Sequence, residues 1–318
     1  MYLSTFKTLT ATTIPINQLV ANHRISSSEA KVFQRLMGLS QVARDENSNH
    51  DLFLNALILN MLDEFPIPTD KVKYILLAHT ADYISPMSVN ILNYIIKKYN
   101  FTHAKYFSTS IYKCAGIFYL IHLSNALIKT IENDEYILLL TVDFAFTPIL
   151  QSIPGSTVLG DSASLVLLSK MKSDHKIIDI IYDVDERFSM GVNESKENNL
   201  LFQSIYIQKL SSIIKKIIIK NSLNLFQIKI IFPHNVNTLS WKQVAKFLSI
   251  SVDKIFLENV PRYAHCFGSD PWINLQTGLM KGLVKPGDYY LLVTVGLGAT
   301  FSVVLMYSHP LRQSEPRT

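Results

Sequence analysis

The sequence predicts an α/β protein made of two similar halves, and three observations support this. Short apolar runs typical of buried strands alternate with stretches of helical spacing. Strand-like runs recur about 155 residues later in the chain, which indicates a duplicated unit. Of the 318 residues, 48% are apolar and 17% are charged, which is enough for a large core. Because strands alternating with helices form mainly parallel, helix-covered sheets, we expect this architecture rather than one large doubly wound sheet.

The first half is expected to span residues 1–170. No clear pattern precedes Thr13. Ser26 is a good helix N-cap because Glu29 falls in the first turn, and Gly38 is placed to end that helix. The predicted helices are 26–36, 51–64, 89–99 and 117–131. The predicted strands are 73–79, 104–108, 136–143 and 162–168.

The second half, residues 171–318, repeats this order. Its predicted strands are 179–183, 228–234, 290–296 and 300–306. Its predicted helices are 239–248 and 272–280. The polar run that ends at Asn199 is interpreted as a connecting loop.

Cys114 lies where a predicted strand passes into a predicted helix. Unpaired backbone N–H groups at a helix N-terminus favour a thiolate, which is the nucleophilic form of cysteine. Cys114 is therefore a candidate nucleophile. The alternative is a buried free cysteine that acts only as a small apolar side chain.

Two histidines lie in polar loops of the second half that suit a partner of Cys114. His234 follows a buried strand, and His265 precedes a predicted helix in a loop that also holds Asp270. A cysteine with histidines elsewhere in the chain is the minimal pattern for covalent acyl chemistry. No HExxH or paired-cysteine motif indicates a metal site. The glycine turn around Gly298 is either a plain hairpin turn or a source of oxyanion-binding N–H groups.

Charge is unevenly distributed. Residues 201–256 hold eight lysines, including Lys242 and Lys246, against one acid, Asp253, whereas the whole chain carries only +5. This segment is either a docking surface for an acidic partner or a solvated helix face. No nucleic-acid motif is present.

The two cysteines do not form a disulfide framework, which fits a reducing cytoplasm. We expect a cytoplasmic protein, because the N-terminus lacks a basic segment followed by an apolar run. The most apolar window, 289–307, is interrupted by glycines, so it is interpreted as two strands rather than a membrane span.

Taken together, the chain resembles the 3-oxoacyl-acyl-carrier-protein synthase III family of the thiolase superfamily. Cys114-Ala115-Gly116 resembles its nucleophile segment, and 159–164 resembles its Gly-Asp-Gly-Ala-Gly turn. His234-Asn235-Val236-Asn237 resembles its His-Gln-Ala-Asn motif, and 285–300 resembles its closing strand and glycine loop. The resemblance covers about Thr13 to Met306, in the same order and with similar spacings.

The resemblance implies a thiolase-like fold, in which two similar halves form five α/β layers. It implies that Cys114 takes an acyl group from coenzyme A or an acyl carrier protein and passes it to a malonyl thioester by decarboxylative condensation. His234 would stabilise the enolate or thioester oxygen, and Asn237 would support the site. It also implies no cofactor and a homodimer, with a heterodimer as an alternative.

Three departures from the family pattern matter. His265 stands where the family has an asparagine, and Asp270 is placed to orient it. The tryptophan and arginine that hold the coenzyme A adenine correspond roughly to Val32 and Leu36. The N-terminal strand is poorly matched before Thr13. These departures favour a specialised natural-product enzyme. Two alternatives to condensation are acyl transfer to oxygen or nitrogen without decarboxylation, and a silent subunit that pairs with an active paralogue.

Overall fold

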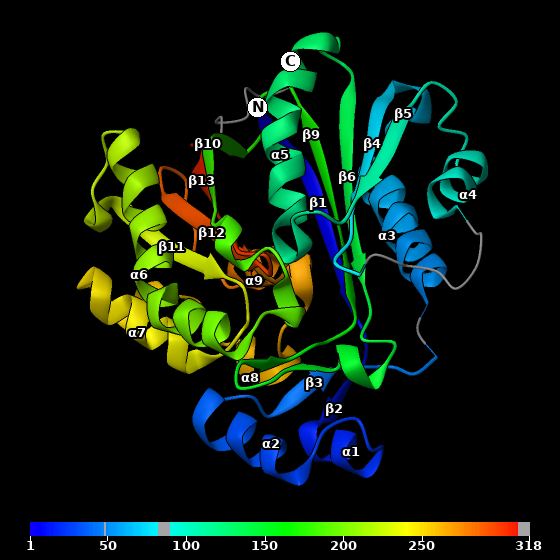
Figure 1. Cartoon of the computed structure of the whole chain (residues 1–318). Coiled ribbons are helices and arrows are strands. Elements are labelled where there is room, and N and C mark those ends of the chain that lie inside the picture. The colour runs from blue at the N-terminus through cyan, green and yellow to red at the C-terminus, as the bar shows by residue number, and fades with distance from the viewer. Residues whose placement is uncertain (48, 82–89, 311–318) are drawn as a thin grey trace.

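The computed structural model describes residues 1–47, 49–81 and 90–310 (Figure 1). Its helices are α1 (Ile16–Ala21), α2 (Ser27–Val32), α3 (His50–Glu64), α4 (Ile91–Lys98), α5 (Gly116–Leu127), α6 (Lys196–Lys220), α7 (Thr238–Leu248), α8 (Val260–Tyr263) and α9 (Asp270–Met280). Its strands are β1 (Tyr2–Thr10), β2 (Thr13–Pro15), β3 (Gln41–Ala43), β4 (Val72–Ala78), β5 (Lys105–Thr109), β6 (Tyr136–Asp143), β7 (Ser152–Ile153), β8 (Thr157–Val158), β9 (Ser162–Ser169), β10 (His175–Val184), β11 (Ile228–Pro233), β12 (Tyr289–Gly296) and β13 (Thr300–Ser308).

Nine strands form one continuous sheet in the order β11-β12-β13-β10-β1-β9-β6-β4-β5. The two ends of this order have the same internal pattern. In β10-β13-β12-β11, two antiparallel pairings are followed by a parallel one, and β1-β9-β6-β4 repeats this. The two half-sheets join where Tyr2 and Leu3 of β1 pair with Lys176 and His175 of β10. The duplicated α/β unit expected from the recurring strands is therefore present in the sheet topology.

Helices cover both faces of each half-sheet (Figure 1). The helices α3 and α4 cover the outer face of the β1-β9-β6-β4-β5 half, and α6 and α7 cover the outer face of the other half. Between the half-sheets lie α5 and α9, which contact strands of both. The order of layers is helix, sheet, helix, sheet, helix, so the expected thiolase-like fold is confirmed.

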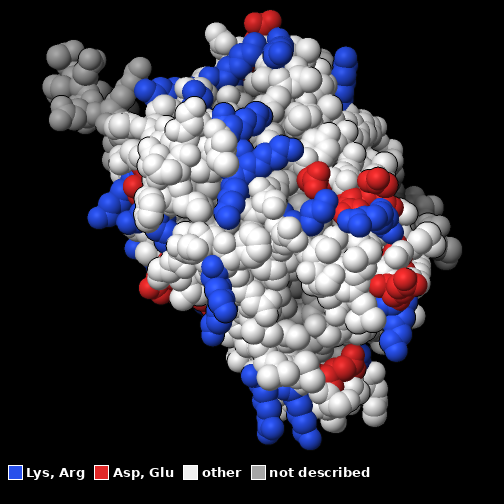
Figure 2. Space-filling view, turned by 60° about the vertical axis from the view of Figure 1, so that its left-hand side comes forward, with Lys and Arg blue, Asp and Glu red and all other residues white. Residues whose placement is uncertain are grey.

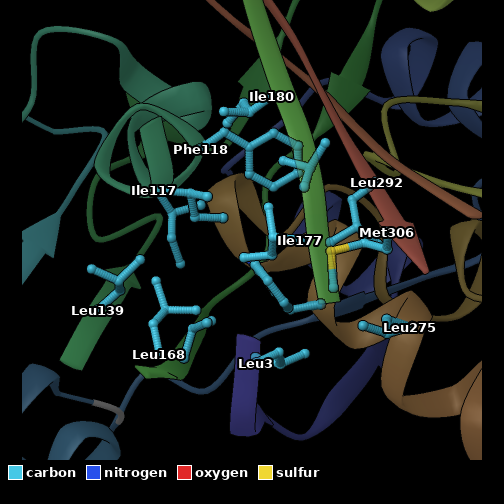
Figure 3. Packing of buried hydrophobic residues seen from close by; sticks show 14 of the residues in the cluster. Leu3, Ile117, Phe118, Leu139, Leu168, Ile177, Ile180, Leu275, Leu292 and Met306 are labelled. Atoms are coloured by element: carbon cyan, nitrogen blue, oxygen red, sulfur yellow. The ribbon is translucent and has the colours of Figure 1, made fainter. Parts of the chain in front are cut away.

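Alternating side chains of the central strands enter different hydrophobic clusters. On β6, Ile137 and Leu139 pack into the central cluster, whereas Leu138 and Leu140 pack against the outer helices. The central cluster draws residues from both halves, among them Phe118 of α5, and Figure 3 shows these side chains pointing toward one another. Burial on both faces explains why these strands have continuous apolar sequences.

Several local predictions are confirmed. Ser26 and Glu29 form a capping box at the start of α2, and Gly38 ends the following π-helical turn with φ of 74°. The helix expected over 89–99 is observed from Ile91, and residue 89 lies outside the described residues.

Two stretches differ from the sequence predictions. The unpatterned N-terminus forms β1, which joins the half-sheets. Most of its side chains are only half-buried, so it lacks the strong apolar signal of the other central strands. The predicted connecting loop ends at Ser195, because its side chain accepts a hydrogen bond from Asn198 N and caps α6. The residues up to Asn199 therefore belong to the first turn of that helix.

Candidate active site

Cys114 lies in a short 3₁₀ turn, Lys113–Ala115, that leads directly into α5. The strand before this turn is β5 and the helix after it begins at Gly116, as the sequence predicts. Cys114 is only 3% exposed, and the Thr80 hydroxyl lies 3.7 Å from its sulfur. Cys114 therefore directly precedes the N-terminus of a 12-residue helix, and helix N-termini favour negative charge nearby.

The hairpin turn after β12 packs tightly against the cysteine turn. A Cβ atom on Gly296 would lie 2.2 Å from the carbonyl oxygen of Tyr112 and 3.1 Å from the backbone nitrogen of Ala115. Only glycine allows the two backbones to approach this closely. The glycine loop is thus a hairpin turn that also supports the nucleophile segment, and Gly298 adopts a φ of 104° within it.

His265 is fixed between Asp270 and Cys114. Its Nδ1 lies 2.5 Å from Oδ2 of Asp270, and the imidazole also forms a side-chain hydrogen bond with Cys114. Burial lowers the pKa of His265, but the negative charges of Asp270 and Cys114 outweigh it and raise the pKa to about 10. The ring therefore carries a positive charge beside the sulfur at neutral pH.

Asp270 is itself completely buried and held by backbone groups. Its carboxylate accepts hydrogen bonds from Asn235 N at 2.6 Å and from Cys266 N at 2.7 Å, in addition to the imidazole. Three donors compensate the desolvation of this charge and fix its orientation. Cys114, His265 and Asp270 thus form a continuous hydrogen-bonded series, with the imidazole between the thiol and the carboxylate.

His234 follows β11 and lies across the same cavity. Its ring centroid is 5.9 Å from that of His265, and its Nε2 is 2.8 Å from the Tyr206 hydroxyl. Burial and then the nearby His265 lower the pKa of His234 well below its ordinary value, so this ring is neutral. Trp241 Nε1 donates a hydrogen bond to the His234 carbonyl at 2.8 Å and stabilises the loop.

Asn237 supports the loop rather than pointing a free amide at the sulfur. Its side chain accepts a hydrogen bond from Ser240 N at 2.7 Å and caps α7, and its Nδ2 donates to the Ser156 carbonyl at 3.0 Å. It nevertheless lines the cavity that contains both histidines.

Two cavities meet at Cys114. The first has a volume of about 360 Å³ and contains His234, His265 and Tyr206. The second has a volume of about 640 Å³ and is lined mainly by apolar side chains, among them Phe144 and Phe267, with Gly298 at its wall. A thioester whose carbonyl reaches the sulfur therefore borders two spaces, a smaller one that contains both histidines and a larger one lined mainly by apolar side chains.

Two features of the site were not predicted from the sequence. Tyr206 contacts His234 across 28 sequence positions, and no local motif marks it. Asp143, at the end of β6, accepts hydrogen bonds from Thr80 N at 2.6 Å and from the Thr80 hydroxyl at 3.3 Å. Burial, only partly offset by Thr80, raises the pKa of Asp143 to about 7. The one sequence signal that could have identified Asp143 is its position as a charged residue at the end of a buried strand.

The lysine-rich segment is partly neutralised by acids outside it. Lys209 pairs with Asp183 of β10 and with Asp185, which directly follows that strand, and Lys220 pairs with Asp179 of β10. Lys242 and Lys246 are exposed one helical turn apart on α7. Figure 2, which brings the side of α6 and α7 forward, shows basic side chains spread over a largely uncharged surface. Gln243, next to Lys242, lines the first cavity, so these lysines lie near its mouth.

None of the helices in the described part of the chain combines the length and apolar character needed to cross a bilayer.

Comparisons with known proteins relate the chain to 3-oxoacyl-[acyl-carrier-protein] synthase III proteins. Residues 218–307 match the family described as 3-oxoacyl-[acyl-carrier-protein] synthase III C terminal. A beta-ketoacyl-[acyl-carrier-protein] synthase III of Wolbachia pipientis subsp. Culex pipiens is 22% identical over 279 residues, which are 83% of this chain and 86% of the relative.

Two solved structures share the fold over nearly the whole chain. The structure of ChlB3, named as an acyltransferase, has a TM-score of 0.83 at 14% identity and covers 97% of both chains. The synthase III structure from Aquifex aeolicus has a TM-score of 0.78 at 15% identity, covering 96% of this chain and 99% of the other.

Proposed function

Since the chain is a 3-oxoacyl-acyl-carrier-protein synthase III-like member of the thiolase superfamily, we propose that Cys114 accepts an acyl group from a thioester and passes it to a second substrate. The observation that carries this proposal is the position of Cys114, which lines both cavities and is hydrogen-bonded to a histidine held by Asp270. The first half of the chain, 1–170, supplies the nucleophile, and the second, 171–318, supplies both histidines.

Loading begins when the Cys114 thiolate attacks the carbonyl carbon of the incoming thioester. The carbon–sulfur bond of the donor breaks, and the protonated His265 gives its proton to the departing thiolate. The acyl chain occupies the larger second cavity, whose lining is mainly apolar, whereas the thiol leaves through the first cavity, which contains both histidines. An apolar tail suits the mainly apolar cavity.

The second step that we propose is decarboxylative condensation. A malonyl thioester in the first cavity loses carbon dioxide, and the resulting enolate carbon attacks the acyl carbonyl on Cys114. A β-ketoacyl thioester forms, the Cys114 thiolate is regenerated, and the neutral His265 takes up a proton from solvent, which restores the imidazolium. His234 together with its hydrogen-bond partner stabilises the enolate oxygen, because hydrogen-bond donors fixed in a buried site stabilise developing negative charge strongly.

One observation favours a second candidate, which is acyl transfer to a hydroxyl or amine. Asp270 holds His265 as a carboxylate holds the base in nucleophile–histidine–carboxylate triads. Once Cys114 is acylated, a neutral His265 so held is suited to remove a proton from an incoming nucleophile. Decarboxylation needs no such base.

The first experiment measures the intact mass of the protein after exposure to a series of acyl thioesters. A mass increase equal to the acyl group is expected in the unmodified protein and is lost in Cys114→Ala. Cys266→Ala is the matched control, because Cys266 is buried in the hydrophobic core, and burial raises the pKa of its thiol well above the ordinary value. Acylation that persists in Cys114→Ala and disappears in Cys266→Ala would refute the assignment of the nucleophile.

Carbon dioxide release distinguishes the two second steps. The acylated protein is mixed with a malonyl carrier, and the products are analysed with and without an added alcohol or amine. Carbon dioxide together with a β-ketoacyl product supports condensation. An ester or amide without carbon dioxide supports transfer, and no product with either acceptor contradicts both.

We propose that the donors are delivered by an acidic acyl carrier protein that docks near Lys242 and Lys246. Both side chains are exposed and lie near the mouth of the first cavity. The positions that correspond to the adenine-binding tryptophan and arginine of the family, Val32 and Leu36, carry exposed apolar side chains instead. These two positions therefore lack the aromatic and cationic side chains with which the family binds the adenine of free coenzyme A.

Charge reversal tests this docking. Lys242→Glu with Lys246→Glu should weaken carrier binding and reduce its dependence on salt, because exposed charges are screened by ions. Lys97→Glu with Lys98→Glu makes the same charge change on α4, which covers the other half-sheet, and should leave binding unchanged. Equal carrier affinity for both double variants and the unmodified protein would refute the docking site.

We also propose that two copies of the chain associate through β5. This strand ends the sheet, and its Tyr106 and Phe107 are 43% and 41% exposed. An exposed edge strand with aromatic side chains is a ready surface for pairing with a second sheet. Phe107→Glu should reduce the molecular mass measured by sedimentation, whereas Phe226→Glu, at an 88% exposed position, should not. A monomeric unmodified protein at micromolar concentration would contradict this.

A further inference from the structure

The Thr80 hydroxyl lies between the sulfur of Cys114 and the carboxylate of Asp143. Thr80 follows β4 and lines the second cavity together with Cys114. Its oxygen is 3.7 Å from the sulfur and 3.3 Å from Oδ2 of Asp143, and both contacts have the geometry of a hydrogen bond. A hydroxyl has a single hydrogen. Thr80 therefore donates either to the nucleophile or to the carboxylate, but not to both at once.

The carboxylate of Asp143 keeps its orientation whichever way that hydrogen points. Asp143 is buried, and its Oδ1 accepts a hydrogen bond from Thr80 N at 2.6 Å. The Thr141 hydroxyl lies 3.5 Å from Oδ2 and is placed to donate to it. Because a backbone donor holds one oxygen and a second hydroxyl serves the other, the carboxylate does not need the Thr80 hydroxyl to remain in place.

The protonation state of Asp143 determines where the hydrogen of Thr80 points. An ionised carboxylate only accepts hydrogen bonds, so it attracts this hydrogen to Oδ2. A protonated carboxyl donates from Oδ2 to the Thr80 oxygen, which leaves the hydrogen of Thr80 free for the sulfur. Burial raises the pKa of Asp143 to about 7, so both states are accessible near neutral pH.

We propose that Thr80 donates a hydrogen bond to the Cys114 thiolate when Asp143 is protonated, and that Asp143 is a positioning residue that acts on the nucleophile through Thr80. This inference rests on the proposed role of Cys114 as the nucleophile of acyl transfer. Thr80 keeps its hydrogen throughout, and the proton on Asp143 comes from solvent. The thiolate then has two donors, His265 and Thr80, whereas the acylated sulfur carries no charge to attract them.

The competing arrangement keeps the hydrogen of Thr80 on Asp143 at all times. Asp143 would then affect Cys114 only through its charge, because a negative carboxylate disfavours a nearby thiolate. The two arrangements differ in what happens when the Thr80 hydroxyl is removed. A charge effect persists in Thr80→Val, whereas an effect transmitted by the hydroxyl is lost.

Other titratable or charged groups lie on the segments around the end of β6. They are His79 beside Thr80, His50 of α3, Lys113 in the turn of Cys114, Asp161 with its partner Arg44, and His265 with Asp270. The positive charge of His265 lowers the pKa of Asp143, and burial outweighs this effect. All of these groups are retained in Thr80→Val, so a change that depends on the Thr80 hydroxyl does not originate in their titration.

The titration of Asp143 measures the coupling directly. Carbon chemical shifts of its carboxyl group, assigned with Asp143→Asn, are followed in the unmodified protein and in Cys114→Ser, which replaces the thiolate by a neutral hydroxyl. A thiolate that draws the hydrogen of Thr80 away favours the protonated carboxyl, and the coupling is reciprocal. The pKa of Asp143 should therefore be about 7 in the unmodified protein and about one unit lower in Cys114→Ser.

The same comparison in the Thr80→Val background decides between the two arrangements. With the hydroxyl removed, Cys114→Ser should lower the pKa of Asp143 by less than about half as much. An equal decrease in both backgrounds means that charge alone couples the two groups, and it overturns the proposal. The absence of any decrease in the unmodified background overturns it as well.

The loading equilibrium of Cys114 provides the functional assay. Because the Thr80 hydroxyl stabilises the thiolate but not the thioester, Thr80→Val should shift the equilibrium toward the acylated protein. A hydrogen bond to a charged group commonly contributes about tenfold or more to an equilibrium, so we expect a shift of about tenfold at about pH 6, where Asp143 is protonated. Thr80→Ser retains the hydroxyl and should retain the unmodified equilibrium. A substitution that only disturbed the fold would weaken loading, and an unshifted or weakened loading equilibrium in Thr80→Val overturns the proposal.

Thr141→Val is the matched control. It removes the other hydroxyl from Oδ2 of Asp143, but Thr141 lines neither cavity at Cys114. The effect of Cys114→Ser on Asp143 and the loading equilibrium should both survive in this variant, and loss of either overturns the specific role of Thr80. Failure of the unmodified protein to load refutes the acyl-transfer proposal instead. The titration of Asp143 still decides the present proposal in that case, because it needs no acyl donor.

Discussion

Asp270→Asn is the perturbation whose consequences the structure defines most fully. Raising the pKa of His265 from 6.5 to about 10 corresponds to about 5 kcal/mol in favour of the charged ring. Asp270 makes the largest contribution to this increase. Asparagine removes the charge. It also directs an NH₂ group at one of the three donors from which the carboxylate accepts hydrogen bonds. Breaking a buried ion pair in this way commonly costs about 3–5 kcal/mol of stability.

The sign of the pH dependence follows from the direction of the pKa shift. Because the pKa of His265 is higher in the folded protein, its contribution to stability is complete below about pH 6.5 and is lost as the pH rises toward about 10. The free energy of unfolding, measured by chemical denaturation, should therefore fall over this interval in the unmodified protein. It should fall much less in Asp270→Asn.

Reactivity of Cys114 provides the second assay. An imidazolium about 4 Å from a thiolate stabilises it by about 4 kcal/mol at an effective dielectric constant of 20. Loss of that charge at pH 7 should slow alkylation of Cys114 by at least about tenfold. Asp161→Asn is the control, because Asp161 is another buried carboxylate, paired with Arg44 at 2.6 Å, that does not contact His265. Unchanged alkylation in Asp270→Asn would refute the charge-pair reasoning.

Two other substitutions test the support of the site. Gly296→Ala should destabilise the protein by about 2 kcal/mol or more and impair loading, because the new Cβ would lie 2.2 Å from the Tyr112 carbonyl oxygen; a fully stable, fully active variant in denaturation and mass assays would contradict this. Asp143→Asn should reduce the loss of stability between about pH 4 and 7 relative to the unmodified protein. The pKa of Asp143 is raised to about 7 by burial, so the folded state binds the extra proton there; parallel stability curves would refute it.

Much of the fold was predictable because its central strands are buried on both faces. Continuous apolar runs such as Tyr136–Asp143 identify such strands without reference to their partners. The strand β1 was missed because most of its side chains are half-buried, and its place in the sheet depends on pairing with β9 and β10, far along the chain. Long-range pairing of this kind has no local sequence signal.

The site was predictable to a similar extent. The position of Cys114 at the start of a helix and the loop positions of His234 and His265 follow from local pattern. The contacts that set the charge state of each histidine do not follow from local pattern. His265 is charged because the backbone N–H groups of Asn235 and Cys266 hold Asp270 beside it, and those contacts exist only in the folded chain.

The two histidines differ in chemical state although they line the same cavity, and this difference constrains any mechanism for the chain. Asp270 raises the pKa of His265, so this ring is charged, and its positive charge lies beside the Cys114 sulfur to which it is bonded. His234 is neutral, in part because that positive charge lies nearby, and its ring nitrogen is engaged by Tyr206. An arrangement in which both imidazoles act as equal donors to one substrate oxygen does not fit these partners. The contacts instead separate the two rings, because His265 is bonded to Cys114 and Asp270 whereas His234 is bonded to Tyr206.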